Sequence, residues 1–169
     1  MCSRKRALAI LVALAISAST PASAADIAAN AGAAIAISGR VQHPQILSPG
    51  DLQRLPPTQV QISFVTGHGT ETGAYTGALL WTVLDDAGLV DEPGRNARLR
   101  HTFLVSGRDG YAVALSEAEL DPDFEGKQVI LAYAKDGKPL DAGDGIRLIV
   151  PNDRHGGRAV RDVAEVAVR

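Results

Sequence analysis

The chain has 169 residues, 46% of them hydrophobic, which suffices for one domain with its own core. Seventeen basic and nineteen acidic residues give a net charge of −2, and this balance, without a basic run, argues against nucleic acid as a partner. Its one cysteine is Cys2, which excludes an intramolecular disulfide framework.

Residues 1–24 have the pattern of a secretory signal peptide. A cationic head at residues 4–6 precedes an apolar run of about a dozen residues, and Ala22 and Ala24 suit cleavage after Ala24. The run is shorter than the roughly 20 residues that span a bilayer, so we expect a protein that is not membrane-embedded and is periplasmic or secreted. Cleavage would remove three basic residues and Cys2, changing the net charge from −2 to −5.

Residues 25–35 carry small side chains without periodicity and are expected to form a flexible N-terminal lead. One domain should then occupy residues 36–169, beginning with a short strand over 36–41. Ser48, followed by Pro49 and three residues later by a carboxylate, is typical of a capped helix start, which predicts a short helix over 51–55.

The central part of the chain predicts a strand, a loop and a helix. Residues 60–64 alternate between apolar and polar side chains, as in a half-buried strand. Residues 66–73 contain three glycines and read as a polar loop. Apolar residues over 78–87 recur at helical spacing, and Gly88 is expected to end this helix. Residues 91–98 read as an exposed charged loop.

The C-terminal half predicts mostly strands. Five segments have strand patterns, at residues 101–105, 111–115, 129–134, 147–151 and 160–169. A second capping box, Ser116 to Glu119, predicts a short helix before a loop whose carboxylates, on Asp121, Asp123 and Glu125, are expected to be solvated. The class is therefore α+β, with mixed β-sheets and a few short helices.

The four histidines show no metal-ligand spacing, so no metal site is expected from them. His43 and His101 are interpreted as structural. His68 lies between two glycines at the end of a strand, and His155 precedes two glycines with arginines nearby. Such loops offer amide donors and guanidinium groups to an anion, although a solvated surface turn is the alternative for both.

Other chemistry is not indicated. The G-x-S-x-G pattern of a nucleophilic serine is absent. Tyr75 and Trp81 flank the expected helix start and are interpreted as core or pocket lining.

Several stretches together resemble the oxidoreductase molybdopterin-binding domain, which has the sulfite-oxidase-like fold. The similarity spans about residues 36–169 and includes SGRV at 38–41, YTG at 75–77, DGY at 109–111, LAY at 131–133, DGKPL at 136–140, RLIVP at 147–151 and GGRAVR at 156–161. The resemblance implies a pocket for an anionic or pterin-like ligand, lined by His68, Arg108, Tyr111, His155, Arg158 and Arg161. Molybdopterin is the cofactor that it suggests.

The sequence departs from the family's pattern at the metal-binding end of the site. Catalytic members carry a molybdenum-binding cysteine just after the strand that matches residues 60–64, whereas this sequence has no cysteine there. Histidine does not replace a thiolate in geometry or charge, so molybdenum is not expected. Arg161 is followed by Asp162 instead of tryptophan, and residues 143–146 lack the family's His-Gly-Pro run.

The signal sequence agrees with a domain that is exported without a molybdenum cofactor. Exported molybdoenzymes need a twin-arginine signal because they cross the membrane folded and loaded, whereas here Lys5 separates Arg4 from Arg6.

Three hypotheses follow. The first is an exported, non-catalytic binding or accessory module for a pterin-like or anionic ligand. The second is an active molybdopterin-dependent oxidoreductase with a non-cysteine metal ligand, such as His68. The third is a module without a small ligand that binds a redox or sensory protein.

Overall fold

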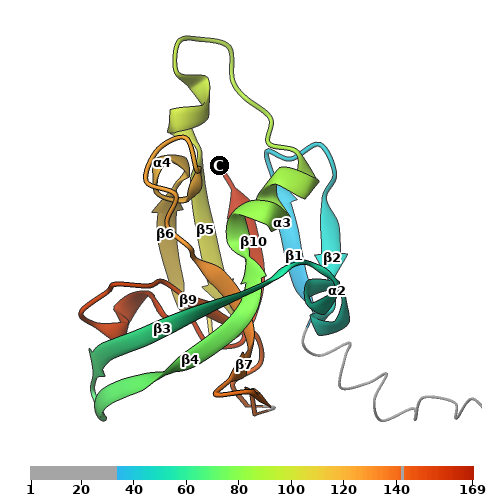
Figure 1. Cartoon of the computed structure of the whole chain (residues 1–169). Coiled ribbons are helices and arrows are strands. Elements are labelled where there is room, and N and C mark those ends of the chain that lie inside the picture. Colours follow the sequence, from blue (N-terminus) through green and yellow to red (C-terminus); the bar gives the residue numbers. More distant parts are fainter. Residues whose placement is uncertain (1–33, 142) are drawn as a thin grey trace, which may run out of the picture.

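A computed structural model describes residues 34–141 and 143–169 of the chain. These residues form two five-stranded sheets (Figure 1). The first sheet contains, in spatial order, β2 (Gln45–Leu47), β1 (Ile35–Gly39), β10 (Val163–Val168), β5 (Thr102–Gly107) and β6 (Ala112–Ser116). Its β1–β10 pair is parallel and its other pairs are antiparallel. The first and last strands of the described chain therefore lie side by side and run in the same direction.

The second sheet is wholly antiparallel. It contains β3 (Pro57–Thr66), β4 (Gly69–Leu79), β7 (Ile130–Lys135) and β8 (Lys138–Pro139), with β9 (Arg147–Ile149) also paired with β7. The strands β3 and β4 form a long hairpin that projects from the rest of the molecule (Figure 1).

Short helical segments connect the strands. These are α2 (Pro49–Arg54), α3 (Leu80–Ala87), α4 (Glu117–Leu120) and the 3-10 turns η1 (Ala97–Arg100) and η2 (Gly156–Arg158). Mixed sheets with few short helices confirm the α+β class. No helix in the described ranges has the length and apolar character to cross a membrane.

The capping signals predicted at Ser48, Gly88 and Ser116 are present in the structure. At α2, the amide of Asp51 donates to the Ser48 hydroxyl and the amide of Ser48 donates to the Asp51 carboxylate, which completes the expected capping box. Gly88 ends α3 with a φ of 70°, a conformation that glycine adopts without strain. The box from Ser116 to Glu119 also forms.

The prediction of a polar loop over residues 66–73 is wrong. Only Gly67 and His68 turn the chain, and β4 begins at Gly69. The segment from Gly69 to Gly73 lacks an alternating apolar pattern, so its strand is set by pairing with β3 and not by its own side chains. For the same reason α3 starts at Leu80, because Ala78 and Leu79 still pair with β7.

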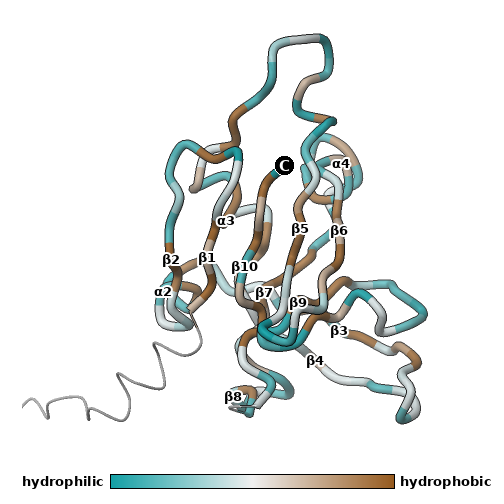
Figure 2. The backbone as a smooth tube through the Cα atoms, turned by 180° about the vertical axis from the view of Figure 1, so that it is seen from behind, coloured by the Kyte–Doolittle hydropathy of each residue, from teal (hydrophilic) through white to brown (hydrophobic). Residues whose placement is uncertain are grey.

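Two groups of apolar side chains form the core. The larger group lies mainly on the first sheet and α3, and a smaller one gathers Val60, Ile62, Phe64, Tyr75 and neighbours from the second sheet. Figure 2 shows hydrophobic segments along strands of both sheets and hydrophilic ones in their connections. The alternation over 60–64 therefore did predict which side of β3 is buried.

Candidate functional site

A cavity of about 430 Å³ lies at the end of the β3–β4 hairpin, and we call it the hairpin cavity. It is lined by Thr66, His68, Gly69, Thr70, Glu71, Thr72, Lys135, Asp144, Arg147 and Arg161. These residues come from the hairpin, the end of β7, the start of β9 and the segments that precede β9 and β10. Segments far apart in the sequence therefore build it.

A buried arginine forms one wall of this cavity. Arg147 begins β9, a strand buried along its length, and its side chain is only 4% exposed. Its Nη1 donates to Glu71 Oε1 at 2.9 Å and to the Tyr75 hydroxyl at 2.6 Å. A buried charge requires such partners, because an unpaired one would cost several kcal/mol.

Glu71 is the acceptor at the centre of this network. Besides Arg147, its Oε1 accepts from the Tyr75 hydroxyl at 2.5 Å and from Lys135 Nζ at 2.9 Å. Partial burial raises the pKa of Glu71, but the hydrogen bonds from Arg147, Tyr75 and Lys135 outweigh it and lower the pKa to about 2. Glu71 is thus ionised at neutral pH.

The cavity carries an excess of positive charge. Lys135, Arg147 and Arg161 face two carboxylates, those of Glu71 and Asp144. Arg161 is loosely held, with 61% of its side chain exposed and its Nε 3.6 Å from Asp144. Arg147 Nε is buried and has no hydrogen-bond partner among the described residues. This arrangement can accept an anion.

His68 and Arg161 are the two expected site residues that line the hairpin cavity. His68 is exposed in the turn between β3 and β4. Its amide donates to Thr66 Oγ1 at 3.1 Å, so this donor is used within the turn and is not open to an anion.

The other four expected site residues lie outside this cavity. Arg158 donates to Asp153 at 2.6 and 2.9 Å and to Glu119 at 2.8 Å. The hydrogen bonds to Asp153, which outweigh the effect of burial, raise the pKa of Arg158. Its guanidinium therefore clamps η2 to α4 and is occupied by carboxylates of its own chain.

Arg108, Tyr111 and His155 are also used within the fold. Arg108 donates to the Ala34 carbonyl at 2.7 Å, and the Tyr111 hydroxyl donates to the Gly157 carbonyl at 2.5 Å. His155 is exposed, while its backbone bridges to Val65 in β3. None of the four cavities described among residues 34–141 and 143–169 is lined by all six residues that the resemblance implied.

Three further residues line the hairpin cavity that were not expected at the site: Glu71, Lys135 and Arg147. Glu71 falls in the segment over residues 66–73 that was expected to be a polar loop, and Lys135 follows the strand expected over 129–134. A signal did exist for Arg147, because it opens an apolar strand segment. A charged residue in a buried strand must be paired, which marks it for attention.

A second charged cluster lies beside α3, α4 and η1. His101 and Glu117 are buried, with Nδ1 and Oε2 2.6 Å apart, and Arg98 pairs with Asp121 at 2.5 Å. Asp121 is only 4% exposed, so the expectation that it is solvated is wrong: the ion pair with Arg98 accounts for its burial. The structural interpretation of His101 agrees with its burial. No group of three metal-ligating side chains occurs in the described ranges.

Comparison with known proteins identifies the class. The family model of the oxidoreductase molybdopterin-binding domain matches residues 24–169, so the chain belongs to that family. The match begins twelve residues before the domain start that we expected. No curated protein matches the chain.

Among solved structures, the sulfane dehydrogenase SoxCD from Paracoccus pantotrophus is similar to this chain, with a TM-score of 0.65 and 20% sequence identity. The alignment covers 80% of this chain and 37% of that one, so this chain corresponds to little more than a third of its length. The likeness agrees with a sulfite-oxidase-like molybdopterin fold.

The family implies a molybdopterin cofactor, and the donors of the hairpin cavity fit one part of it. Lys135, Arg147 and Arg161 suit the anionic end of such a molecule. The cavity offers nitrogen and oxygen donors, and no cysteine occurs in the described residues. This donor set does not fit the thiolate-bound metal end.

Proposed function

We propose that this protein is an exported, non-catalytic module that binds an anionic, pterin-like small ligand in the hairpin cavity. The observation that carries the proposal is the excess of positive charge there, from Lys135, Arg147 and Arg161 against Glu71 and Asp144. Arg161 supplies the accessible cation, and Arg147 supplies a fixed, buried one. Fixed donors bind an anion at little cost in side-chain entropy.

The absence of a thiolate supports binding over molybdenum catalysis. In the catalytic members that the sequence resembles, the metal ligand follows the strand equivalent to residues 60–64. Here the chain runs from Phe64 through Val65 and Thr66 into a tight turn. Export of an unfolded chain, the route favoured by the spacing of Arg4 and Arg6, would deliver a domain without a metal loaded in the cytoplasm.

The decisive measurement is the cofactor content of the native protein. We would purify it from the periplasm of its own host, determine its N-terminal residue, measure molybdenum by mass spectrometry and measure pterin fluorescence after denaturation. A chain beginning at Ala25, with pterin and without molybdenum, is the expected result. Stoichiometric molybdenum would overturn the proposal.

A thermal-shift series locates the ligand. Inorganic phosphate and a pterin monophosphate should raise the melting temperature of the wild type but have a much smaller effect on Arg161→Ala. Arg158→Ala is the matched control, because Arg158 is paired with Asp153 and Glu119 outside the cavity. It should keep the ligand-induced shift, measured from its own lower starting temperature. Equal ligand-induced shifts of the melting temperature in wild type and Arg161→Ala would show that Arg161 does not bind the ligand.

A second candidate is an active molybdopterin-dependent oxidoreductase with a non-cysteine metal ligand. Membership of the family and the exposed position of His68 at the cavity favour it. It predicts that the native protein contains molybdenum and that His68→Ala loses the metal. The same mass-spectrometric measurement therefore separates the two candidates.

A further inference from the structure

The strand β3 forms an edge of the second sheet, with β4 on one side only. Its pairing with β4 is regular from Pro57 to Thr66, without a bulge. In an antiparallel pair, consecutive residues alternate between those whose backbone groups face the partner strand and those whose groups face away. Half of the backbone groups of β3 therefore point to the free edge.

One hydrogen bond identifies the outward-facing set. The amide of Val65 donates to the carbonyl of Arg154 at 3.0 Å, and Val65 bridges to His155 in parallel. The residues two, four and six positions earlier, Ser63, Gln61 and Gln59, share this orientation. Within the described ranges, no backbone hydrogen bond joins these three residues to any segment at the free edge. Within the described residues, the free edge of β3 is thus hydrogen-bonded at Val65 and unpaired from Gln59 to Ser63.

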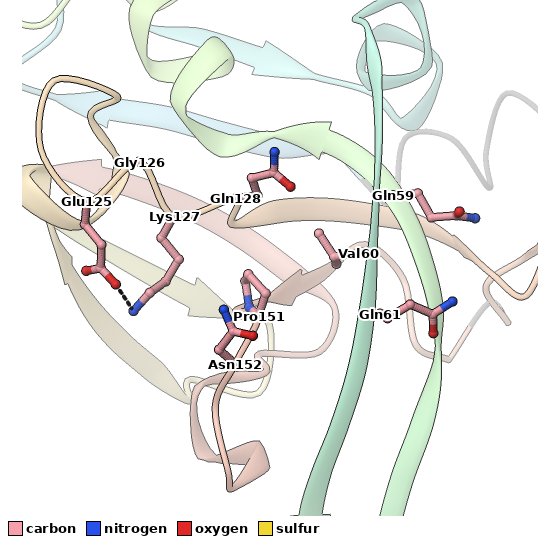
Figure 3. Close-up of a pocket in the computed structure, with 9 residues that line it drawn as sticks. All are labelled: Gln59, Val60, Gln61, Glu125, Gly126, Lys127, Gln128, Pro151 and Asn152. Atoms are coloured by element: carbon pink, nitrogen blue, oxygen red, sulfur yellow. Dashed lines mark ion pairs between the residues drawn. The ribbon is translucent and has the colours of Figure 1, made fainter.

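Two adjoining cavities follow this open part. One, of about 420 Å³, is lined by Gln59, Val60, Gln61, Glu125, Gly126, Lys127, Gln128, Pro151 and Asn152. The next, of about 350 Å³, shares Gln61 and Asn152 with it and extends to Arg154. Figure 3 shows Glu125 to Gln128 and Pro151 to Asn152 on the side of β3 toward which Val60 points, whereas Gln59 and Gln61 point away.

The charges along these cavities define the chemistry of the occupant. Lys127 pairs with Glu125 at 3.1 Å (Figure 3), and Asp153 pairs with Arg158. Of the charged groups that line the two cavities, Arg154 alone forms no ion pair within the described part of the chain. It lies at the end where Val65 is already paired. The centre is therefore neutral, and one end is positive.

We propose that β3 is a docking edge for an extended peptide of a partner protein, uncharged at its centre and with a carboxylate at the end near Arg154. The peptide would add as a strand beside Gln59–Ser63, continuing the line that Arg154 and His155 begin. Its backbone would satisfy the outward amides and carbonyls, and alternate side chains would enter the two cavities. This surface is separate from the hairpin cavity and does not depend on the ligand proposed there.

The test uses the full protein and a defined probe. The probe is an acetylated, amidated peptide of seven alternating threonine and valine residues with a glutamate at each end. Hydrogen exchange, followed by NMR, should show that saturating peptide slows exchange of the amides of Gln59, Gln61 and Ser63 about tenfold. Unchanged exchange at these amides would overturn the proposal.

Two controls separate backbone pairing from other effects. Gln61→Pro removes one outward donor without touching the ladder to β4, because proline is tolerated on the open side of an edge strand. It should weaken binding roughly tenfold relative to Gln61→Ala, which shortens the same side chain but keeps the backbone donor. A peptide with every backbone nitrogen methylated should not bind the wild type, which tests pairing even if the proline variant fails to fold.

The remaining outcomes concern the identity of the occupant. A peptide with lysine in place of the terminal glutamates should bind more weakly, and tighter binding would contradict the assigned charge. Sedimentation of the protein alone should show no association through β3. A dimer that Gln61→Pro dissociates would overturn the proposal in favour of a second copy of this chain.

Discussion

Glu71 in β4 accepts hydrogen bonds from Arg147 in β9, at 2.9 Å from Nη1 and 3.4 Å from Nη2, across 76 residues of sequence. The pair joins the projecting β3–β4 hairpin to β9, the strand that pairs with β7. It also forms the wall of the hairpin cavity, so the same contact supports the fold and shapes the candidate site.

Glu71→Gln should destabilise the protein at neutral pH but not in strong acid. The folded-state pKa of Glu71 is about 2, below the ordinary value of 4.5. Its contribution is therefore fully present above pH 4.5 and is lost as the pH falls through 2. Urea unfolding should show a difference from wild type of about 2 kcal/mol at pH 6 that disappears near pH 2.

Glu125→Gln is the matched control for this measurement. Glu125 is 52% exposed and pairs with Lys127 at the surface, so its removal should change the free energy of unfolding by less than about 1 kcal/mol. A pH-independent difference for Glu71→Gln would show that its charge contributes nothing to stability.

Arg147→Met should cost about 3–5 kcal/mol of unfolding free energy, because it leaves the Glu71 carboxylate without its main partner in a mostly buried site. The double variant with Glu71→Gln should lose less than the sum of the two single variants, since the second change removes the uncompensated charge. A double-mutant cycle by urea unfolding measures this coupling. Additive effects would mean that the two side chains do not interact energetically.

Glu117→Gln should show the opposite pH dependence. Burial raises the pKa of Glu117, which outweighs its hydrogen bond with His101. A raised folded-state pKa gives stability that is present below about 4.5 and lost as the pH rises through the folded value. The wild type should therefore lose stability relative to the variant as the pH rises above about 4.5. A relative gain over this range, measured by urea unfolding, would contradict the assignment.

Gly77→Ala should destabilise the second sheet by about 1–3 kcal/mol. A Cβ on Gly77 would lie 2.3 Å from the Leu131 carbonyl oxygen, where β4 and β7 approach closely beside an irregularity in their register. Gly67→Ala is the control, because nothing lies within 4 Å of its Cβ position. Thermal unfolding should show a lower melting temperature for Gly77→Ala than for the wild type, and a nearly unchanged one for Gly67→Ala.

Local chemistry determined what the sequence predicted well. Ser48 and Ser116 start helices through side-chain bonds to residues three positions away, and Gly88 ends α3 through its own backbone freedom. The alternation over 60–64 reflects which face of β3 is buried. Each of these signals is complete within a few residues, so the α+β class and most element positions could be predicted from the sequence.

Only the tertiary structure decided which charged residues share a site. Arg158 and Arg161 lie three residues apart in one motif, yet Arg158 is held by Asp153 and Glu119 while Arg161 reaches the hairpin cavity. Arg147 and Glu71 meet only because β4 and β9 both pair with β7. An ion pair depends on distance in space, and long-range strand pairing sets that distance without leaving a pattern in the neighbouring sequence.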